Sequence, residues 1–135
     1  MKKIIVLLLV LTTFVTTWSF AKHFWRGEVI NSAEVKKRWG KTPLDETKFK
    51  AGNSSVRAPM AFALMKTAKS YVGKDRTEIE QKFGRPDGFY FSDMFPAYMI
   101  QRGKEVGEDS WQIVFLLDRE QKVSEIVVHK NCCEK

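Results

Sequence analysis

The sequence predicts an α+β domain: a two-helix hairpin packed on a three-stranded antiparallel sheet, preceded by an N-terminal extension. Apolar residues recur at helical spacing between 59 and 84, and three aromatic and β-branched runs follow between 97 and 129. A chain of 135 residues has enough apolar surface for one core. We therefore divide it into a signal peptide (1–21), an extension (22–58) and an α+β domain (59–135).

The first 21 residues have the order of a secretory signal peptide. Two lysines precede an apolar run from Ile4 to Val15, and Ser19 and Ala21 are the small residues expected before a cleavage site. We expect cleavage after Ala21, which would give a periplasmic or secreted protein. A peripheral position at the outer membrane is a further expected location. The alternative is an uncleaved anchor, because the apolar stretch reaches the lower limit for crossing a bilayer.

One helix is predicted inside the extension. Asn31 is a suitable N-cap, Glu34 follows three residues later, and Gly40 ends the helix Ser32–Trp39. From Pro43 to Ser55 the composition indicates a loop.

The first helix of the hairpin begins near Pro59, a residue favoured in the first helical turn. Apolar positions then recur every three or four residues: Met60, Leu64, Ala68 and Tyr71 or Val72. Lys66 and Lys69 fall on the opposite face, and Gly73 ends the helix.

The second helix is short and has clear boundaries. Asp75 and Glu78 form a cap pair, and Ile79 and Phe83 lie one turn apart on the apolar face. Gly84, with Pro86 behind it, ends the helix.

Three strands are predicted: Ala97 to Arg102, Trp111 to Leu117 and Val123 to His129. The connections 103–110 and 118–122 are short, so the strands should form antiparallel hairpins.

The middle strand is apolar on both faces. We expect the helices to cover its odd-numbered side: Trp111, Ile113, Phe115 and Leu117. Gln112, Val114 and Leu116 share the other face, for which cover by the N-terminal extension is favoured over cover by a partner.

No residue pattern indicates catalysis, a metal or a cofactor. His129, Cys132, Cys133 and the distant His23 lack the usual zinc spacing. The alternative is that His129 is a surface histidine at a strand end, and that the two adjacent cysteines, which close no long loop, are oxidised or bonded to another chain. The net charge of +7 falls to +5 when the expected signal peptide is removed with its two lysines, and this excess favours anionic partners. An exported protein seldom meets nucleic acid, so lipid headgroups or an acidic protein are favoured. We therefore expect a non-enzymatic protein.

The densest feature is an aromatic run of five candidate partner-binding residues: Phe89, Tyr90, Phe91, Phe95 and Tyr98. Side chains alternate along an extended segment, so Phe89 and Phe91 should not be buried together with Tyr90. Two interpretations stay open, with burial of the whole run in the core slightly favoured; in the other, one side is exposed and binds a partner, most readily through Tyr90 or Phe95.

Part of the chain resembles the BamE family (also called SmpA or OmlA) of small outer-membrane assembly lipoproteins. The matching segments are Val72-Gly73, Thr77-Glu78-Ile79, Phe83-Gly84-Arg85-Pro86, Tyr98, Trp111 to Asp118 and Val123 to Val128. The resemblance implies two helices on a three-stranded sheet and a non-enzymatic accessory role, binding assembly proteins and anionic lipid. The family's mature chain begins with a lipidated cysteine, whereas this chain has no cysteine before Cys132.

We thus expect a protein-binding module of the periplasm or envelope, accessory to outer-membrane protein assembly or envelope integrity. Its expected partners are an envelope or outer-membrane protein and, as a further class, anionic lipid headgroups. The alternative is a secreted inhibitor that inserts Phe91 or Phe95 into the cleft of a periplasmic or extracellular enzyme. Nothing in the sequence indicates an oligomeric state.

Overall fold

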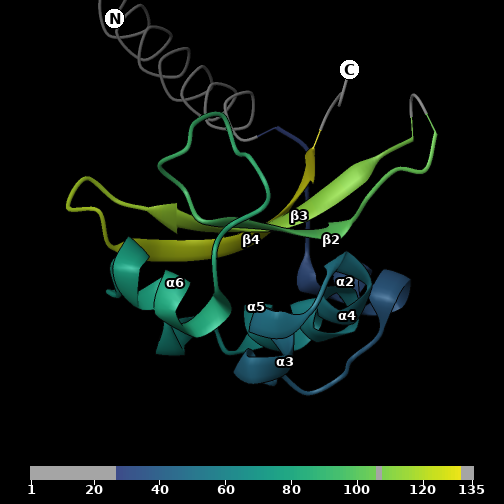
Figure 1. The fold of residues 1–135 in the computed structure, drawn as a ribbon, viewed down its shortest axis with the longest axis horizontal. Helices are drawn as coiled ribbons and strands as arrows, with labels where there is room; N and C mark the ends of the chain where they lie inside the picture. Colours follow the sequence, from purple (N-terminus) through teal and green to yellow (C-terminus); the bar gives the residue numbers. More distant parts are fainter. Residues whose placement is uncertain (1–26, 106–107, 132–135) are drawn as a thin grey trace, which may run out of the picture.

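A computed structural model describes residues 27–105 and 108–131 and confirms the α+β class. An antiparallel sheet has the strand order β1-β4-β3-β2, and the helices lie against one of its faces (Figure 1). The strands are β1 (Val29–Ile30), β2 (Ala97–Gln101), β3 (Ser110–Leu117) and β4 (Val123–Asn131). The expected signal peptide, His23, Cys132 and Cys133 lie outside the described residues.

The three predicted strands are present with ends shifted by at most two residues, but the strand number was wrong. β1 adds a fourth strand, in which Val29 pairs with His129 and Ile30 with Val128. Two residues are too few for an alternating pattern, so only their pairing with β4 identifies them as a strand.

Two helices match the sequence prediction closely. α2 (Ser32–Trp39) is capped by the Asn31 side chain, and α6 (Arg76–Phe83) has a complete capping box between Asp75 and Glu78. Among the described residues, no helix combines the length and apolar character needed to cross a membrane.

The expected loop from Pro43 to Ser55 is instead largely helical, in α3 (Glu46–Ala51) and the start of α4 (Ser54–Arg57). The Asp45 and Asn53 side chains cap these helices. Helices of six and four residues are too short to show a period in the sequence, so this prediction was wrong.

The first helix of the hairpin is divided rather than continuous to Gly73. A 3-10 turn (Ala58–Met60) leads into α5 (Ala61–Lys66), and a second 3-10 turn (Ala68–Ser70) follows Thr67. The Thr67 hydroxyl donates to the Ala63 carbonyl and lies where the α-helix stops.

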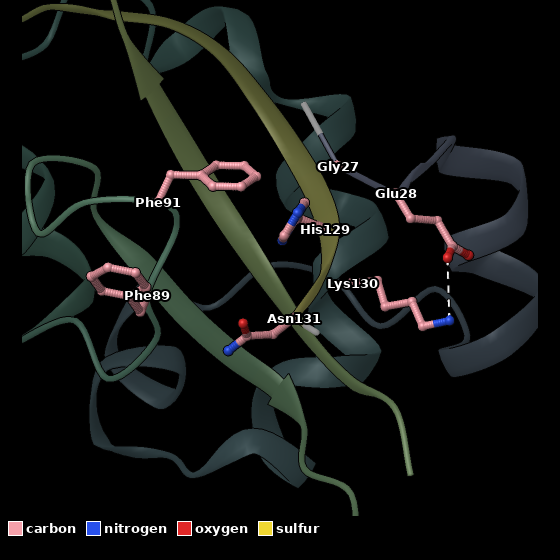
Figure 2. A pocket seen from close by; sticks show the side chains of 7 residues that line it. All are labelled: Gly27, Glu28, Phe89, Phe91, His129, Lys130 and Asn131. Atoms are coloured by element: carbon pink, nitrogen blue, oxygen red, sulfur yellow. Dashed lines mark ion pairs between the residues drawn. The ribbon is translucent and has the colours of Figure 1, made fainter. Parts of the chain in front are cut away.

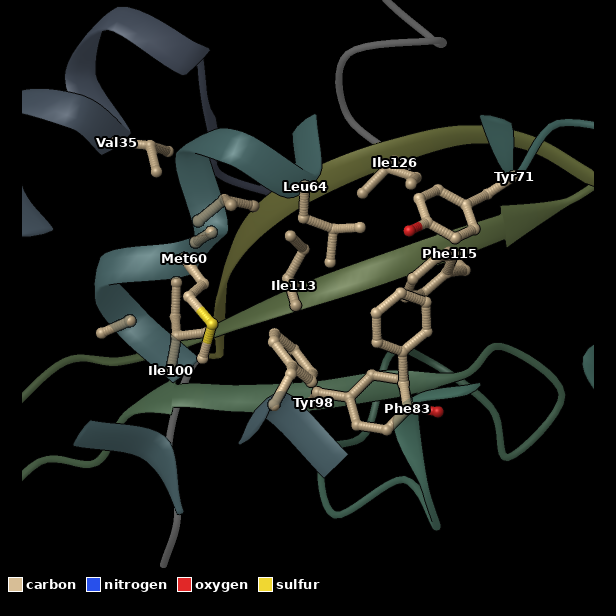
Figure 3. Close-up of a cluster of buried hydrophobic side chains, with 14 of the residues drawn as sticks. Val35, Met60, Leu64, Tyr71, Phe83, Tyr98, Ile100, Ile113, Phe115 and Ile126 are labelled. Atoms are coloured by element: carbon tan, nitrogen blue, oxygen red, sulfur yellow. The ribbon is translucent and has the colours of Figure 1, made fainter. Parts of the chain in front are cut away.

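One apolar core lies between the helices and the sheet (Figure 3). Phe83 packs in tilted or edge-to-face contact with Tyr71, Tyr98 and Phe115. Val35 and Phe49, from the segment expected to be an extension, are fully buried in the same core. The segment 27–58 is thereby packed on the sheet and helices of the domain.

Candidate functional site

The face of the sheet opposite the helices is covered by residues 89–95, here called the aromatic loop (Figure 1). A second apolar cluster lies between this loop and the sheet. The loop contributes Tyr90 and the half-buried Phe95, which pack with residues including Val114 and Val127. Cover by the N-terminal extension (22–58) was expected, but among its described residues, 27–58, only Val29 belongs to the cluster. The aromatic loop lies close to this face of the sheet because β2 follows it directly in the sequence.

Gln112 anchors the start of the aromatic loop. This fully buried side chain accepts a hydrogen bond from the Phe89 backbone N–H at 2.9 Å and donates one to the Phe89 carbonyl. The amide thus pairs with the loop backbone as a neighbouring strand would, and it satisfies both polar groups of Phe89.

Gly88 permits this close approach. Its N–H donates to the Ala97 carbonyl at 2.9 Å, which places the backbone against the edge of β2. A Cβ at position 88 would lie 2.4 Å from Gln112 Oε1 and 3.1 Å from the Ala97 carbonyl carbon. Only glycine fits without displacing the anchor.

Two of the five predicted partner-binding residues are buried, which corrects the expectation for them. Tyr90 packs edge-to-face on Phe91, Phe95 and His129, and Tyr98 lies in the main core with its hydroxyl donating to the Gly84 carbonyl. Tyr90 and Phe95 were expected to be the exposed pair, but Tyr90 is buried and Phe95 half-buried. Phe89 and Phe91 are exposed whereas Tyr90 is buried, but Phe91 is not turned to the opposite side, since its ring packs edge-to-face on both Tyr90 and His129.

Three large apolar side chains of the loop region are exposed: Phe89 (51%), Phe91 (62%) and Met94 (47%). Phe89 and Phe91 line the same pocket and are here called the exposed tip, whereas Met94 contacts Gln121 in the turn between β3 and β4. Phe91 has a φ of 54°, a left-handed conformation that is uncommon for a bulky residue. Arg76 of α6 donates to the carbonyls of Asp93 and Met94 and so holds the far end of the loop.

Beside the exposed tip lies a pocket of about 480 Å³. Figure 2 shows Phe91 extending from the loop toward His129 on β4, with Gly27 and Glu28 on the other side of that histidine. Lys130 forms ion pairs with Glu28 at 3.2 Å and with Asp109 at 3.0 Å. The pocket therefore combines aromatic walls with a neutralised cation at its rim.

His129 forms the inner wall of this pocket. It is nearly buried, its Nδ1 lies 3.3 Å from Gln112 Nε2, and burial lowers its pKa although the Glu28 carboxylate acts in the opposite direction. Within residues 27–105 and 108–131, no group of three or more His, Cys, Asp or Glu side chains is placed to hold a metal ion.

The sequence did not indicate Gln112 or His129 as part of the site. Gln112 carried the one usable signal, since it is a polar residue in the otherwise apolar run Trp111 to Leu117. A buried amide in such a strand requires partners, and here the partners are the Phe89 backbone and His129.

No family model matches this sequence, and neither the curated proteins nor the solved structures include a match. The resemblance to the BamE family therefore stays a prediction.

Proposed function

We propose that this protein is a non-enzymatic binding module of the periplasm or envelope, which contacts an envelope or outer-membrane protein through the exposed tip. The single observation that carries the proposal is the exposure of Phe89 and Phe91 beside one pocket, on a loop with both ends held. Exposed apolar side chains that lie together are typical of protein interaction sites.

The loop geometry supports binding because the backbone is already ordered. Gln112 fixes the start of the loop, Tyr90 fills the space beneath it, and Arg76 holds its end. A partner would therefore lose little conformational entropy in ordering this surface, and a rigid aromatic anchor contributes strongly to affinity.

A second candidate function is inhibition of a periplasmic or extracellular enzyme. Among the described residues Phe91 is the most exposed of the large apolar side chains, at 62%, and a single projecting ring of this kind could insert into a cleft. The two functions differ in the partner: a membrane protein for an assembly accessory, and a soluble hydrolase for an inhibitor.

Crosslinking in intact envelopes, followed by recovery of the partner, tests the proposal. Phe91→Ala should leave the melting temperature nearly unchanged and weaken association by about thirtyfold, which corresponds to roughly 2 kcal/mol for a central aromatic anchor. Val72→Ala is the matched control, since Val72 is also about half exposed but belongs to the connection between α5 and α6 and is not part of the loop or its pocket, and it should retain the partner.

Recovery of a membrane protein that is lost in Phe91→Ala and kept in Val72→Ala supports the accessory role. Recovery of a soluble enzyme with the same dependence supports inhibition. Equal recovery by both variants, or loss in both, contradicts binding through the exposed tip.

A further inference from the structure

Hydrogen-bond directions around Gln112 determine which nitrogen of His129 carries the proton. The Phe89 N–H can only donate and the Phe89 carbonyl can only accept, so the Gln112 oxygen must face the former and its nitrogen the latter. The remaining N–H of Gln112 Nε2 then points to His129 Nδ1 at 3.3 Å. Nδ1 is therefore an acceptor, and the neutral ring carries its proton on Nε2.

Protonation of His129 would place a second N–H on Nδ1, opposite the N–H of Gln112. Gln112 cannot rotate its amide to offer the oxygen instead, because rotation would break both hydrogen bonds to Phe89. The cationic ring and the anchored loop thus compete for the same amide.

His129 is desolvated mainly by aromatic rings and backbone, with Phe91 packed on it at 5.7 Å between ring centroids in addition to Tyr90. On the loop side, the Tyr90 ring packs on His129 with the ring centroids 4.7 Å apart. On the Nε2 side, the Gly27 backbone lies so close that a Cβ at position 27 would be 2.4 Å from His129 Nε2. Glu28, from the segment before β1, is the carboxylate that favours the charged form. On β4 the adjacent Lys130 is itself paired with Glu28 and with Asp109.

We propose that His129 is a pH-sensitive latch: its protonation releases the Phe89 backbone from Gln112 and undocks the aromatic loop from the sheet. The latch itself does not depend on the proposed function. Its consequence rests on that function, because undocking in acid would remove the surface that the partner binds. Undocking would also expose Tyr90, which covers the apolar face of β3 and β4.

The direction of the pH effect follows from linkage. Burial sets the pKa of His129 in the folded protein below the ordinary value of 6.5. The unfolded or undocked form therefore binds the proton more readily, and docking weakens as the pH falls from 6.5 toward the lower folded pKa. Above 6.5 the latch is closed.

Nuclear magnetic resonance of the purified chain, without any partner, tests the latch. Ring nitrogen shifts at about pH 7.5 should show the Nε2–H form, and acidification to about pH 4.5 should titrate His129 with a midpoint below that of a free histidine. The Phe89 amide and the Gln112 side-chain amide should shift with the same midpoint. In His129→Gln, which does not titrate, the Phe89 amide should show no such transition.

Glu28→Gln supplies a second measurement that does not depend on His129→Gln folding. Removal of this carboxylate should lower the His129 midpoint further, since it favours the cation. An Nδ1–H ring at neutral pH, a midpoint at or above 6.5, a midpoint raised in Glu28→Gln, or a Phe89 transition that persists in His129→Gln would each overturn the latch. None of these outcomes bears on whether the exposed tip binds a partner.

Discussion

Replacement of Gln112 by leucine should detach the aromatic loop while leaving the main core intact. Gln112 is fully buried, and its amide makes two hydrogen bonds to Phe89 and one contact to His129. Leucine has a similar size but offers no donor or acceptor. The Phe89 N–H and carbonyl must then either stay unpaired under the loop or leave the sheet for water.

The expected loss of stability follows from these contacts. At about 1 kcal/mol for each net hydrogen bond, the three lost contacts amount to about 3 kcal/mol, and the more apolar leucine returns roughly 1 kcal/mol. The net loss of about 2 kcal/mol should lower the melting temperature by roughly 9 °C in a domain of this size.

Thermal unfolding measures the loss of stability, and amide hydrogen exchange measures the detachment of the loop. Gln112→Leu should melt earlier, and the Phe89 amide should exchange faster than in the wild type. Gln81→Leu is the matched control on the exposed face of α6 and should change stability by no more than about 0.5 kcal/mol. If Gln112→Leu melts like Gln81→Leu and leaves Phe89 protected, Gln112 is not the anchor of the loop.

Two further predictions concern the main core and the acid limit of stability. Tyr98→Phe removes the hydroxyl that donates to the Gly84 carbonyl at 2.8 Å and should cost about 1 kcal/mol in urea unfolding; an unchanged midpoint would contradict this contribution. Burial alone would raise the pKa of Glu46, but hydrogen bonds from Tyr71 and Lys82 lower it below 4.5. The stability that this carboxylate contributes is therefore present above pH 4.5 and lost as the pH falls through the lower folded value, so Glu46→Gln should flatten the acid limb of a stability curve. An acid limb as steep as that of the wild type would show that the ion pair makes no contribution.

Local signals in the sequence were sufficient where one segment determines its own structure. The Asp75 and Glu78 cap pair and the glycine at position 84 predicted α6, because these groups bond to backbone within a single helical turn. Alternation predicted the two faces of β3, because side chains alternate in any extended segment.

Alternation does not say which side of a loop faces the protein, and this limited the prediction of the site. Tyr90 is buried and Phe91 exposed because Gln112 holds the Phe89 backbone against β3, a contact across 23 positions of sequence. No local pattern in residues 89–95 contains that information. The same holds for β1, which is a strand only through its pairing with β4.

The sequence by itself thus determined the α+β class, the three main strands, α2, α6 and the concentration of aromatic side chains before β2. The tertiary structure decided which aromatic residues are available to a partner and brought Gln112 and His129 beneath them. The physical reason is the range of the interactions: caps and alternation act between near neighbours, whereas a buried amide obtains its partners only after distant strands and loops have packed together.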